Sequence, residues 1–311
     1  MIYDVIIIGL GASGVSASIY AKRSGLNVCV INYGIPGGII STSSIVENYP
    51  GFKSISGSDF AFNLFEQFNN LDVPLFNEEV INIIDGDIKE VKTKNNIYKA
   101  KKLIICSGRK PRRLDVENED KFLGRGISYC ATCDGNLYKD KTVCVVGGGN
   151  SALESALYLS NLCKKVYILV RKDKFIGNKN LIDEVNEKEN ICIKFMTNII
   201  SVEGNDVVTG VKTNNGEIKL DGIFINIGYE PSINIVKNLN IKLDKNYIVV
   251  DEHMETNIKG IYAAGDIIKK DLYQLVTAVS EGAIAATNVY KSIKKWCFFH
   301  IIFYFIFILY K

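Results

Sequence analysis

Two cysteines, Cys130 and Cys133, lie three positions apart in the segment "YCATCDGNLYKDKTVCVVGGGNSALESAL", directly ahead of a glycine-rich stretch. On a tight turn that opens a helix, thiols with this spacing lie within reach of a disulfide bond. Such pairs lower the pKa of one thiol and are redox-active. The alternative is half of a zinc site. No second Cys-x-x-Cys exists, and the only histidines, His253 and His300, lie far away in sequence, so we expect a redox pair and no metal.

A strand-turn-helix-strand unit is predicted at the start of the chain, in "YDVIIIGLGASGVSASIYAKRSGLNVCVIN". An apolar run predicts a buried strand, helical periodicity continues to Ser24, and a second strand ends near Ile31. The G-x-G-x-x-G between strand and helix lets the backbone approach a pyrophosphate at the helix N-terminus. The second strand ends in Asn32, where an acidic residue often holds ribose hydroxyls; an amide can still donate and accept there. The residues of the turn that we predict to bind a dinucleotide are Gly9, Gly11, Ala12, Ser13 and Gly14.

A second unit of the same kind is predicted in "KTVCVVGGGNSALESALYLSNLCKKVYILVRKDKF". Its helix is expected to end near Leu162, and its second strand is "KVYILV". Arg171 and Lys172 follow that strand, and such cations suit a 2′-phosphate, although a solvated basic edge is the simpler alternative. Two units indicate two dinucleotides or an internal duplication, and electron transfer is the most economical function for two. The candidate ligands in the turn are Gly147, Gly149, Asn150, Ser151 and Ala152.

The composition indicates a two-domain enzyme of a reducing cytoplasm. The chain has 311 residues, 47% of them hydrophobic, and its net charge of +3 comes from 37 basic and 34 acidic residues without a basic run. Nucleic acid is therefore not an expected partner. Eight cysteines are sparse for a disulfide framework, and we see no leader sequence. Four cysteines in apolar runs are expected to be buried: Cys29, Cys106, Cys144 and Cys192.

Two further stretches are rich in turn residues. In "NYGIPGGIISTSSIVENYPGF", Gly37 and Gly38 suggest a backbone that lies against something flat or bulky, although an ordinary surface loop has the same composition. The apolar strand "GIYAAGDI" ends in Gly265 and Asp266, before a helix predicted from Gln274 to Val289. The Asp266 carboxylate can hydrogen-bond a ribityl or ribose hydroxyl, or cap a helix.

Taken together, "GLGASG", "GGI...VENYPGF", "CATCDG", "GGGNSA" and "AAGDI...QLVTAVSEGAIAA" resemble the low-molecular-weight thioredoxin reductases of the bacterial type, in the same order from Met1 to about Tyr290. The resemblance implies an α/β fold of two Rossmann-like, three-layer ββα dinucleotide-binding domains, the second inserted in the first. It implies FAD at the first turn and NADPH at the second. The implied FAD domain comprises residues 1–112 and 242–295, the NAD(P)H domain with the redox pair comprises 113–241, and an atypical apolar tail comprises 296–311.

The resemblance also assigns roles to individual residues. Cys133 is expected to contact the flavin and take its electrons, Cys130 to attack the disulfide of thioredoxin, and Asp134 to donate or accept a proton for the pair. Rotation of the nucleotide domain would bring the nicotinamide and the disulfide to the flavin in turn. A homodimer is implied as well. The further cofactor-binding residues that the resemblance implies are Gly37, Gly38, Asn48, Gly228, Gly265, Asp266 and Gln274.

The phosphate clamp departs from the family pattern. The family has His-Arg-Arg and a further Arg four positions later, whereas this chain has Val170, Arg171, Lys172 and Ile176. Loss of one guanidinium weakens nucleotide binding by about 1 to 3 kcal/mol. NADPH stays the favoured donor, with NADH or reduced ferredoxin as alternatives. The ferredoxin-linked flavin thioredoxin reductases keep the dithiol and lose the nucleotide motifs, but "GGGNSA" is intact here.

Other substitutions cluster at the expected flavin site. The family's Tyr-Arg-Gln is Leu272, Tyr273 and Gln274 here, and Ile39 replaces the Gln of its Gly-Gly-Gln loop. The non-enzyme alternative is a flavin-bound redox sensor that has lost turnover. Both thiols are retained, which favours the enzyme.

An apolar and aromatic tail, "WCFFHIIFYFIFILY", covers Trp296 to Tyr310, beyond the end expected from the family. As a helix it would reach about 23 Å, short of the roughly 30 Å core of a bilayer, so no full membrane span is expected. The alternatives are an anchor at the membrane surface, an oligomer contact, and translated noncoding sequence without function. Such a segment is prone to aggregation.

Overall fold

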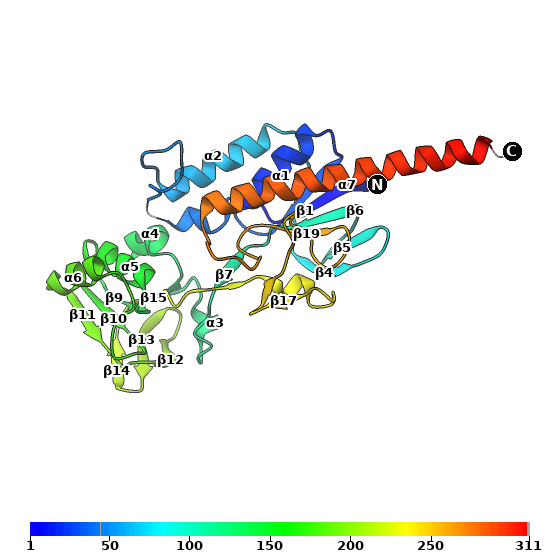
Figure 1. Cartoon of the computed structure of the whole chain (residues 1–311). Helices are drawn as coiled ribbons and strands as arrows, with labels where there is room; N and C mark the ends of the chain where they lie inside the picture. The colour runs from blue at the N-terminus through cyan, green and yellow to red at the C-terminus, as the bar shows by residue number, and fades with distance from the viewer. Residues whose placement is uncertain (44, 310–311) are drawn as a thin grey trace. The chain divides into compact units, whose positions relative to one another are not determined.

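The computed structural model describes residues 1–43 and 45–309 (Figure 1). The chain forms two compact units: a first unit made of Met1–Lys110 and Pro231–Lys311, and an inserted unit, Pro111–Glu230. The two crossings between them, β7 (Arg109–Pro111) and β16 (Tyr229–Pro231), pair with each other.

The first unit is built on a mixed sheet. Its strands are β1 (Ile2–Ile8), β2 (Val28–Asn32), β3 (Leu75–Asn77), β4 (Val80–Ile84), β5 (Lys89–Thr93), β6 (Ile97–Ile105) and β19 (Ile261–Ala263). The order is β3-β2-β1-β6-β5-β4, with β19 parallel to β6. The central strands are continuous apolar runs because an apolar core packs on each face of the sheet.

Helices cover one face of this sheet. They are α1 (Ala12–Arg23), α2 (Gly57–Asn69) and α7 (Leu275–Leu309), and the short turn η1 (Gly38–Thr42) packs against α2. The turn η3 (Ile233–Val236) and a small hairpin of β17 (Leu243–Asp244) and β18 (Tyr247–Ile248) contribute to the core on the other face. Figure 1 shows α1 and α7 side by side. They pack backbone to backbone, because a Cβ on Gly282 of α7 would lie 2.1 Å from the Ser13 carbonyl oxygen.

The inserted unit has a parallel sheet and an antiparallel one. The parallel order is β11-β10-β9-β15-β8, and the antiparallel order is β12-β13-β14. The bounds are β8 (Ile127–Ser128), β9 (Thr142–Val146), β10 (Lys165–Leu169), β11 (Ile191–Lys194), β12 (Ile199–Gly204), β13 (Val208–Thr213), β14 (Gly216–Lys219) and β15 (Gly222–Ile225). Its helices are α3 (Glu119–Phe122), α4 (Ala131–Asp134), η2 (Gly135–Tyr138), α5 (Asn150–Ser160) and α6 (Lys179–Glu187).

The α/β class and both strand-turn-helix-strand units are confirmed: β1, α1 and β2 form the first, and β9, α5 and β10 the second. The helix expected from Gln274 to Val289 is α7, which extends to Leu309. The side chains of residues 295–311, on which the interpretation of the tail depends, lie outside the described part. Within the described residues, the structure contains no helix with the length and apolar character needed to cross a membrane.

The chain returns from the inserted unit to the first unit earlier than the boundary expected after residue 241. The division falls between Glu230 and Pro231. The following segment contributes Ile233, Val236 and Ile241 to the core of the first unit, which explains this position. The burial of the cysteines differs from the expectation in one case: Cys29, Cys106 and Cys144 are buried as expected, whereas Cys192 is partly exposed in β11, an edge strand of its sheet.

Glu119 fixes the segment of chain that leads to the dithiol, through hydrogen bonds to residues on both sides of it in sequence. Its side chain is 2% exposed and accepts N–H groups from Leu114 (3.2 Å) and Asp115 (2.8 Å). It also accepts the Tyr129 hydroxyl at 3.0 Å. Burial raises the pKa of the Tyr129 hydroxyl, and the hydrogen bond to Glu119 raises it further. Because Tyr129 directly precedes Cys130, Glu119 fixes the approach to the redox pair.

Glu119→Ala is expected to lower the free energy of unfolding by about 2 to 4 kcal/mol, because it leaves buried donors without an acceptor. Urea unfolding followed by circular dichroism measures the change. Glu117→Ala removes an exposed carboxylate two residues away and is expected to stay within about 0.5 kcal/mol of the parent. Equal unfolding midpoints for the two variants would contradict this role of Glu119.

Candidate active site

The dithiol forms a disulfide at the start of α4. Cys130 and Cys133 are bonded, with their Cα atoms 5.3 Å apart. Cys130 precedes the helix and is half-buried, whereas Cys133 is exposed. The Cys133 N–H donates to the Cys130 sulfur at 3.2 Å. The predicted pair is therefore present in its oxidised form, with a backbone donor directed at one of its sulfurs.

Ser128 connects this pair to Asp134. The Cys130 N–H donates to Ser128 Oγ at 3.0 Å, and the Ser128 hydroxyl donates to Asp134 Oδ2 at 2.6 Å. Asp134 therefore lies close to the dithiol turn with its carboxylate orientation fixed. Sequence reasoning did not find Ser128, because a serine at the end of a short strand carries no signal of its own.

The glycine turn of the inserted unit forms one wall of a cavity of about 730 Å³. A Cβ on Gly147 would lie 2.3 Å from the Asn226 carbonyl oxygen, so this position requires glycine. A Cβ on Gly149 would meet nothing within 4 Å, which leaves open space above the turn. A bound diphosphate requires both kinds of glycine: one that permits a close backbone contact and one that leaves room above the turn. The cavity has the size of a site for a cofactor-sized ligand.

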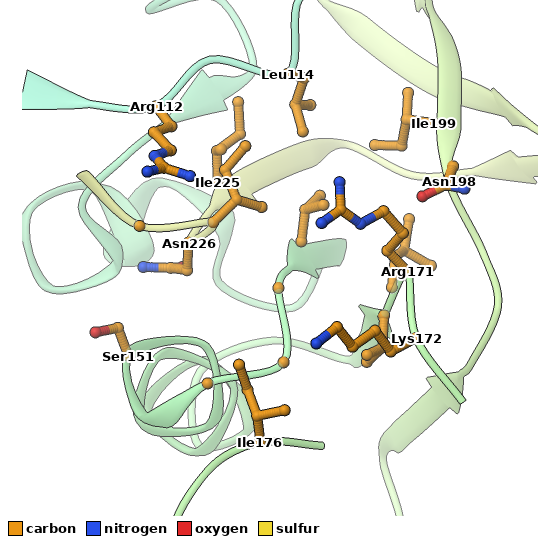
Figure 2. Close-up of a pocket in the computed structure, with 18 of the residues that line it drawn as sticks. Arg112, Leu114, Ser151, Arg171, Lys172, Ile176, Asn198, Ile199, Ile225 and Asn226 are labelled. Atoms are coloured by element: carbon orange, nitrogen blue, oxygen red, sulfur yellow. The ribbon is translucent and has the colours of Figure 1, made fainter. Parts of the chain in front are cut away.

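The cavity is strongly basic. Figure 2 shows Arg112, Arg171 and Lys172 directed into it, and Arg113 and Lys174 also line it. No Asp or Glu lies among the described residues of its lining. The predicted cations after β10 therefore line the same cavity as the glycine turn. Gly228, Asn150 and Ser151 are brought to it as well.

The two substituted clamp positions have different surroundings. Val170 is buried and packs against Gly148, whose Cβ would lie 2.8 Å from a Val170 methyl group. Ile176 lines the cavity and is 67% exposed. An exposed apolar side chain therefore stands in the cavity lining where the family has a cation.

The first turn has the same construction. A Cβ on Gly14 would lie 2.0 Å from the Gly9 carbonyl oxygen, whereas the nearest atoms to a Cβ on Gly11 would be 3.8 Å away. The Leu10 N–H donates to Asn32 Oδ1 at 2.9 Å, and Asn32 Nδ2 donates to the Gly34 carbonyl oxygen at 3.1 Å. Asn32 thus fixes the turn itself, a structural role that the sequence did not suggest.

The loop that carries Gly37 and Gly38 packs against this turn. The Gly37 N–H donates to the Leu10 carbonyl oxygen at 2.8 Å, and Gly11 and Gly37 form a β-bridge. Gly37 is buried with φ of +101°, and its Cβ would lie 2.6 Å from that of Ala61 in α2. This loop is therefore closely packed at Gly37, unlike an ordinary surface loop.

Predicted flavin residues that are far apart in sequence lie together. Asn48 Nδ2 donates to Gln274 Oε1 at 3.0 Å. Gly265 has φ of +84°, and its N–H donates to Glu281 at 2.9 Å. The pKa of Glu281 is raised overall, because the effect of burial exceeds the opposing effect of its hydrogen bond with Lys270. The open space at Gly11 and this set of polar groups fit a bound dinucleotide.

Arg109 is a residue of this site that sequence reasoning missed. Its Nε and Nη2 donate to Asp266 Oδ2 at 3.0 and 2.6 Å, and its guanidinium lies 4.7 Å from the centre of the Tyr273 ring. Lys270 lies 3.4 Å from the other oxygen of Asp266. Arg109 follows β6 and Asp266 follows β19, so only the pairing of these strands brings them together.

Comparisons with known proteins agree with this arrangement. Residues 3–282 match the pyridine nucleotide-disulphide oxidoreductase family. The thioredoxin reductase of Mycoplasma pneumoniae is 38% identical over 299 residues, covering 93% of this chain and 95% of that protein. That of Bacillus subtilis is 39% identical, covering 93% and 94%. The crystal structure of Lactococcus lactis thioredoxin reductase has a TM-score of 0.84 at 35% identity, covering 94% of this chain and 99% of that one.

Arg109→Ala is expected to raise the dissociation constant for FAD about tenfold, because Asp266 and Tyr273 lose the group that orients them. Titration of the apoprotein with FAD, followed by flavin fluorescence, measures this. Arg109→Lys should recover only part of the loss, since an ammonium cannot donate through a planar fork. Arg23→Ala, which removes an exposed cation at the end of α1, is the control. Indistinguishable affinities for the Arg109 and Arg23 variants would refute the expectation.

Proposed function

This chain belongs to the pyridine nucleotide-disulphide oxidoreductases and, within them, to the low-molecular-weight thioredoxin reductases of the bacterial type, and on that premise we propose that it passes electrons from NADPH, through FAD and the Cys130–Cys133 pair, to the disulfide of thioredoxin. The observation that carries the proposal is the redox disulfide in the same compact unit as a basic nucleotide cavity. A homodimer and a cytoplasmic location complete the proposal on the strength of the family resemblance.

FAD, when bound, supplies the exchange of two electrons between a nicotinamide and a disulfide. We assign its binding to the first unit, and that of the nicotinamide nucleotide to the inserted unit. The residues proposed to hold FAD are Gly9, Gly11, Ala12, Ser13, Gly14, Asn32, Gly37, Gly38, Asn48, Gly265, Asp266 and Gln274. Those proposed to hold NADPH are Gly147, Gly149, Asn150, Ser151, Ala152, Arg171, Lys172 and Gly228.

The dithiol performs the outward step. Reduction of the Cys130–Cys133 disulfide takes up two electrons and two protons. The Cys130 thiolate then attacks one sulfur of the thioredoxin disulfide, and the Cys133 thiolate attacks Cys130, which re-forms the internal disulfide and releases thioredoxin with both thiols. The Cys133 N–H would stabilise a thiolate at Cys130, which supports Cys130 as the attacking group. Asp134, held by Ser128, is the proposed proton donor or acceptor.

Arg171 and Lys172 support NADPH as the donor, since they line the cavity on the side of β10. A second candidate donor, reduced ferredoxin, is favoured by one observation: the apolar Ile176 lies where the family has a further Arg. NADH is the third, because it needs no 2′-phosphate clamp. The retained glycine turn and the absence of carboxylates from the described lining favour a nucleotide.

Anaerobic reduction of the purified flavoprotein by NADPH, NADH and reduced ferredoxin, followed at the visible flavin band, is expected to be fastest with NADPH. Arg171→Gln should weaken NADPH binding by about tenfold and leave NADH unchanged, because it removes one charged bond to the 2′-phosphate. Faster bleaching with ferredoxin than with either nucleotide would sink the NADPH assignment and leave the disulfide reductase intact.

Cys130→Ser and Cys133→Ser are each expected to lower thioredoxin reduction by at least about a thousandfold, because a hydroxyl cannot complete thiol–disulfide exchange. Both variants should still bind FAD and be bleached by NADPH. Cys192→Ser, at a partly exposed thiol outside the pair, is the matched control and should keep its turnover. Turnover of thioredoxin by either dithiol variant would overturn the proposed route.

A further inference from the structure

Asn198 has a side-chain amide that is open to the basic cavity. The residue lines the cavity, its side chain is exposed, and Figure 2 shows it at the edge of the cavity. Its backbone is fixed, because its N–H donates to Asn214 Oδ1 at 2.8 Å and its carbonyl oxygen accepts the Asn214 N–H at 3.2 Å. Within the described part of the chain, the amide of Asn198 itself makes no hydrogen bond. Both its donor and its acceptor are therefore available to a ligand.

Backbone hydrogen bonds hold Asn198 beside the cations of the phosphate clamp. The N–H groups of the two residues that precede it donate to the carbonyl oxygens of Val170 (3.0 Å) and Lys172 (3.1 Å). These two carbonyl groups flank Arg171, and the bonds extend the pairing of β11 with β10. Asn198 therefore lies next to Arg171, on the side of β10 that faces away from the glycine turn.

The covalent structure of the nucleotide determines what meets the amide. If the 2′-phosphate binds at Arg171 and Lys172, the adenine base is attached to the neighbouring carbon of the same ribose. The base then lies within reach of a side chain held beside Arg171. Aliphatic side chains that can pack on the faces of a purine also line this cavity: Leu114, Ile176 and Ile199. The lining thus offers apolar surface to the faces of a base and an amide to its edge.

A carboxamide matches one edge of adenine. On that edge the N6 amino group donates and N7 accepts, so an amide can form two parallel hydrogen bonds, the pairing by which Asn and Gln read adenine in DNA. This edge lies nearer to the ribose than N1 does, which suits a side chain held close to the clamp. Hypoxanthine has an oxygen in place of the amino group. Both atoms of its edge accept, so the amide can form only one of the two bonds.

We propose that Asn198 selects adenine in the nucleotide: its Oδ1 accepts a hydrogen bond from the N6 amino group, and its Nδ2 donates to N7. The inference rests on the proposed function and deepens it, because it assigns recognition of the base to a named side chain. The glycine turn and the cations bind phosphate groups, which dinucleotides with any base share. Selection among bases therefore requires a residue at the base itself.

Equilibrium binding to the oxidised, FAD-loaded enzyme tests the proposal. The parent is expected to bind NADP⁺ about tenfold more tightly than nicotinamide hypoxanthine dinucleotide phosphate, a factor typical of one lost hydrogen bond. Asn198→Ala should raise the dissociation constant for NADP⁺ about tenfold and bind the two dinucleotides equally. Asn205→Ala, which alters an exposed residue between β12 and β13, is the matched control and should keep the preference of the parent.

A shorter ligand and a stability measurement complete the test. Adenosine 2′,5′-bisphosphate carries the base and the 2′-phosphate without the nicotinamide half, so Asn198→Ala should weaken its binding by the same factor as that of NADP⁺. Thermal unfolding without nucleotide should be unchanged, because the side chain is exposed and the two backbone bonds to Asn214 remain.

Two outcomes would overturn the proposal. A parent enzyme that binds the adenine and hypoxanthine dinucleotides within about twofold of each other does not read this edge of the base. An Asn198→Ala variant that keeps the preference of the parent would assign base selection to another group. Failure of the proposed function differs from both, since the parent would then bind neither NADP⁺ nor adenosine 2′,5′-bisphosphate.

Discussion

The architecture depends on two glycine turns at which the backbone of a strand end touches neighbouring backbone without an intervening side chain. A Cβ on Gly14 would lie 2.0 Å from the Gly9 carbonyl oxygen, and one on Gly147 would lie 2.3 Å from that of Asn226. This approach brings the N-termini of α1 and α5 to the carboxyl edge of each sheet. The positive end of the helix and several backbone N–H groups then face the same open space, which suits a diphosphate. The other features of each site are arranged around that space.

The two sites differ in charge, and the difference matches the proposed binding of FAD at the first turn and of the nicotinamide nucleotide at the second. At the first turn the cations Arg109 and Lys270 are paired with the carboxylates of Asp266 and Glu281, so the surroundings are close to neutral. At the second turn, cations line the cavity without carboxylates in the described lining. A permanently bound cofactor needs oriented polar partners, whereas a carrier that must arrive and leave gains from an attractive field. The dithiol lies in the same unit as this basic cavity.

The sequence predicted those parts of the site that are local along the chain. The glycine turns, the Cys-x-x-Cys pair and the cations after β10 are short motifs between a strand and a helix, and each was found where expected. Arg109 was missed because its partner Asp266 is brought to it by the pairing of β19 with β6, and Ser128 was missed because a serine at the end of a short strand carries no signal of its own. Asn32 lay at the expected position, but its amide is engaged with Leu10 and Gly34, a difference that only the fold reveals.

The pairing of β19 with β6 has a consequence for biosynthesis. These neighbouring strands, joined at Tyr262 and Ile104, lie on opposite sides of the inserted unit in the chain. A ribosome releases all of Pro111–Glu230 before it makes β19 and α7, so the inserted unit can fold while its host is incomplete. A folded insert whose ends are held by β7 and β16 also shortens the loop that β19 must close, which lowers the entropic cost of that step. The order of synthesis thus favours a nascent chain in which the unit that carries Cys130 and Cys133 folds first and the sheet of the first unit is completed last.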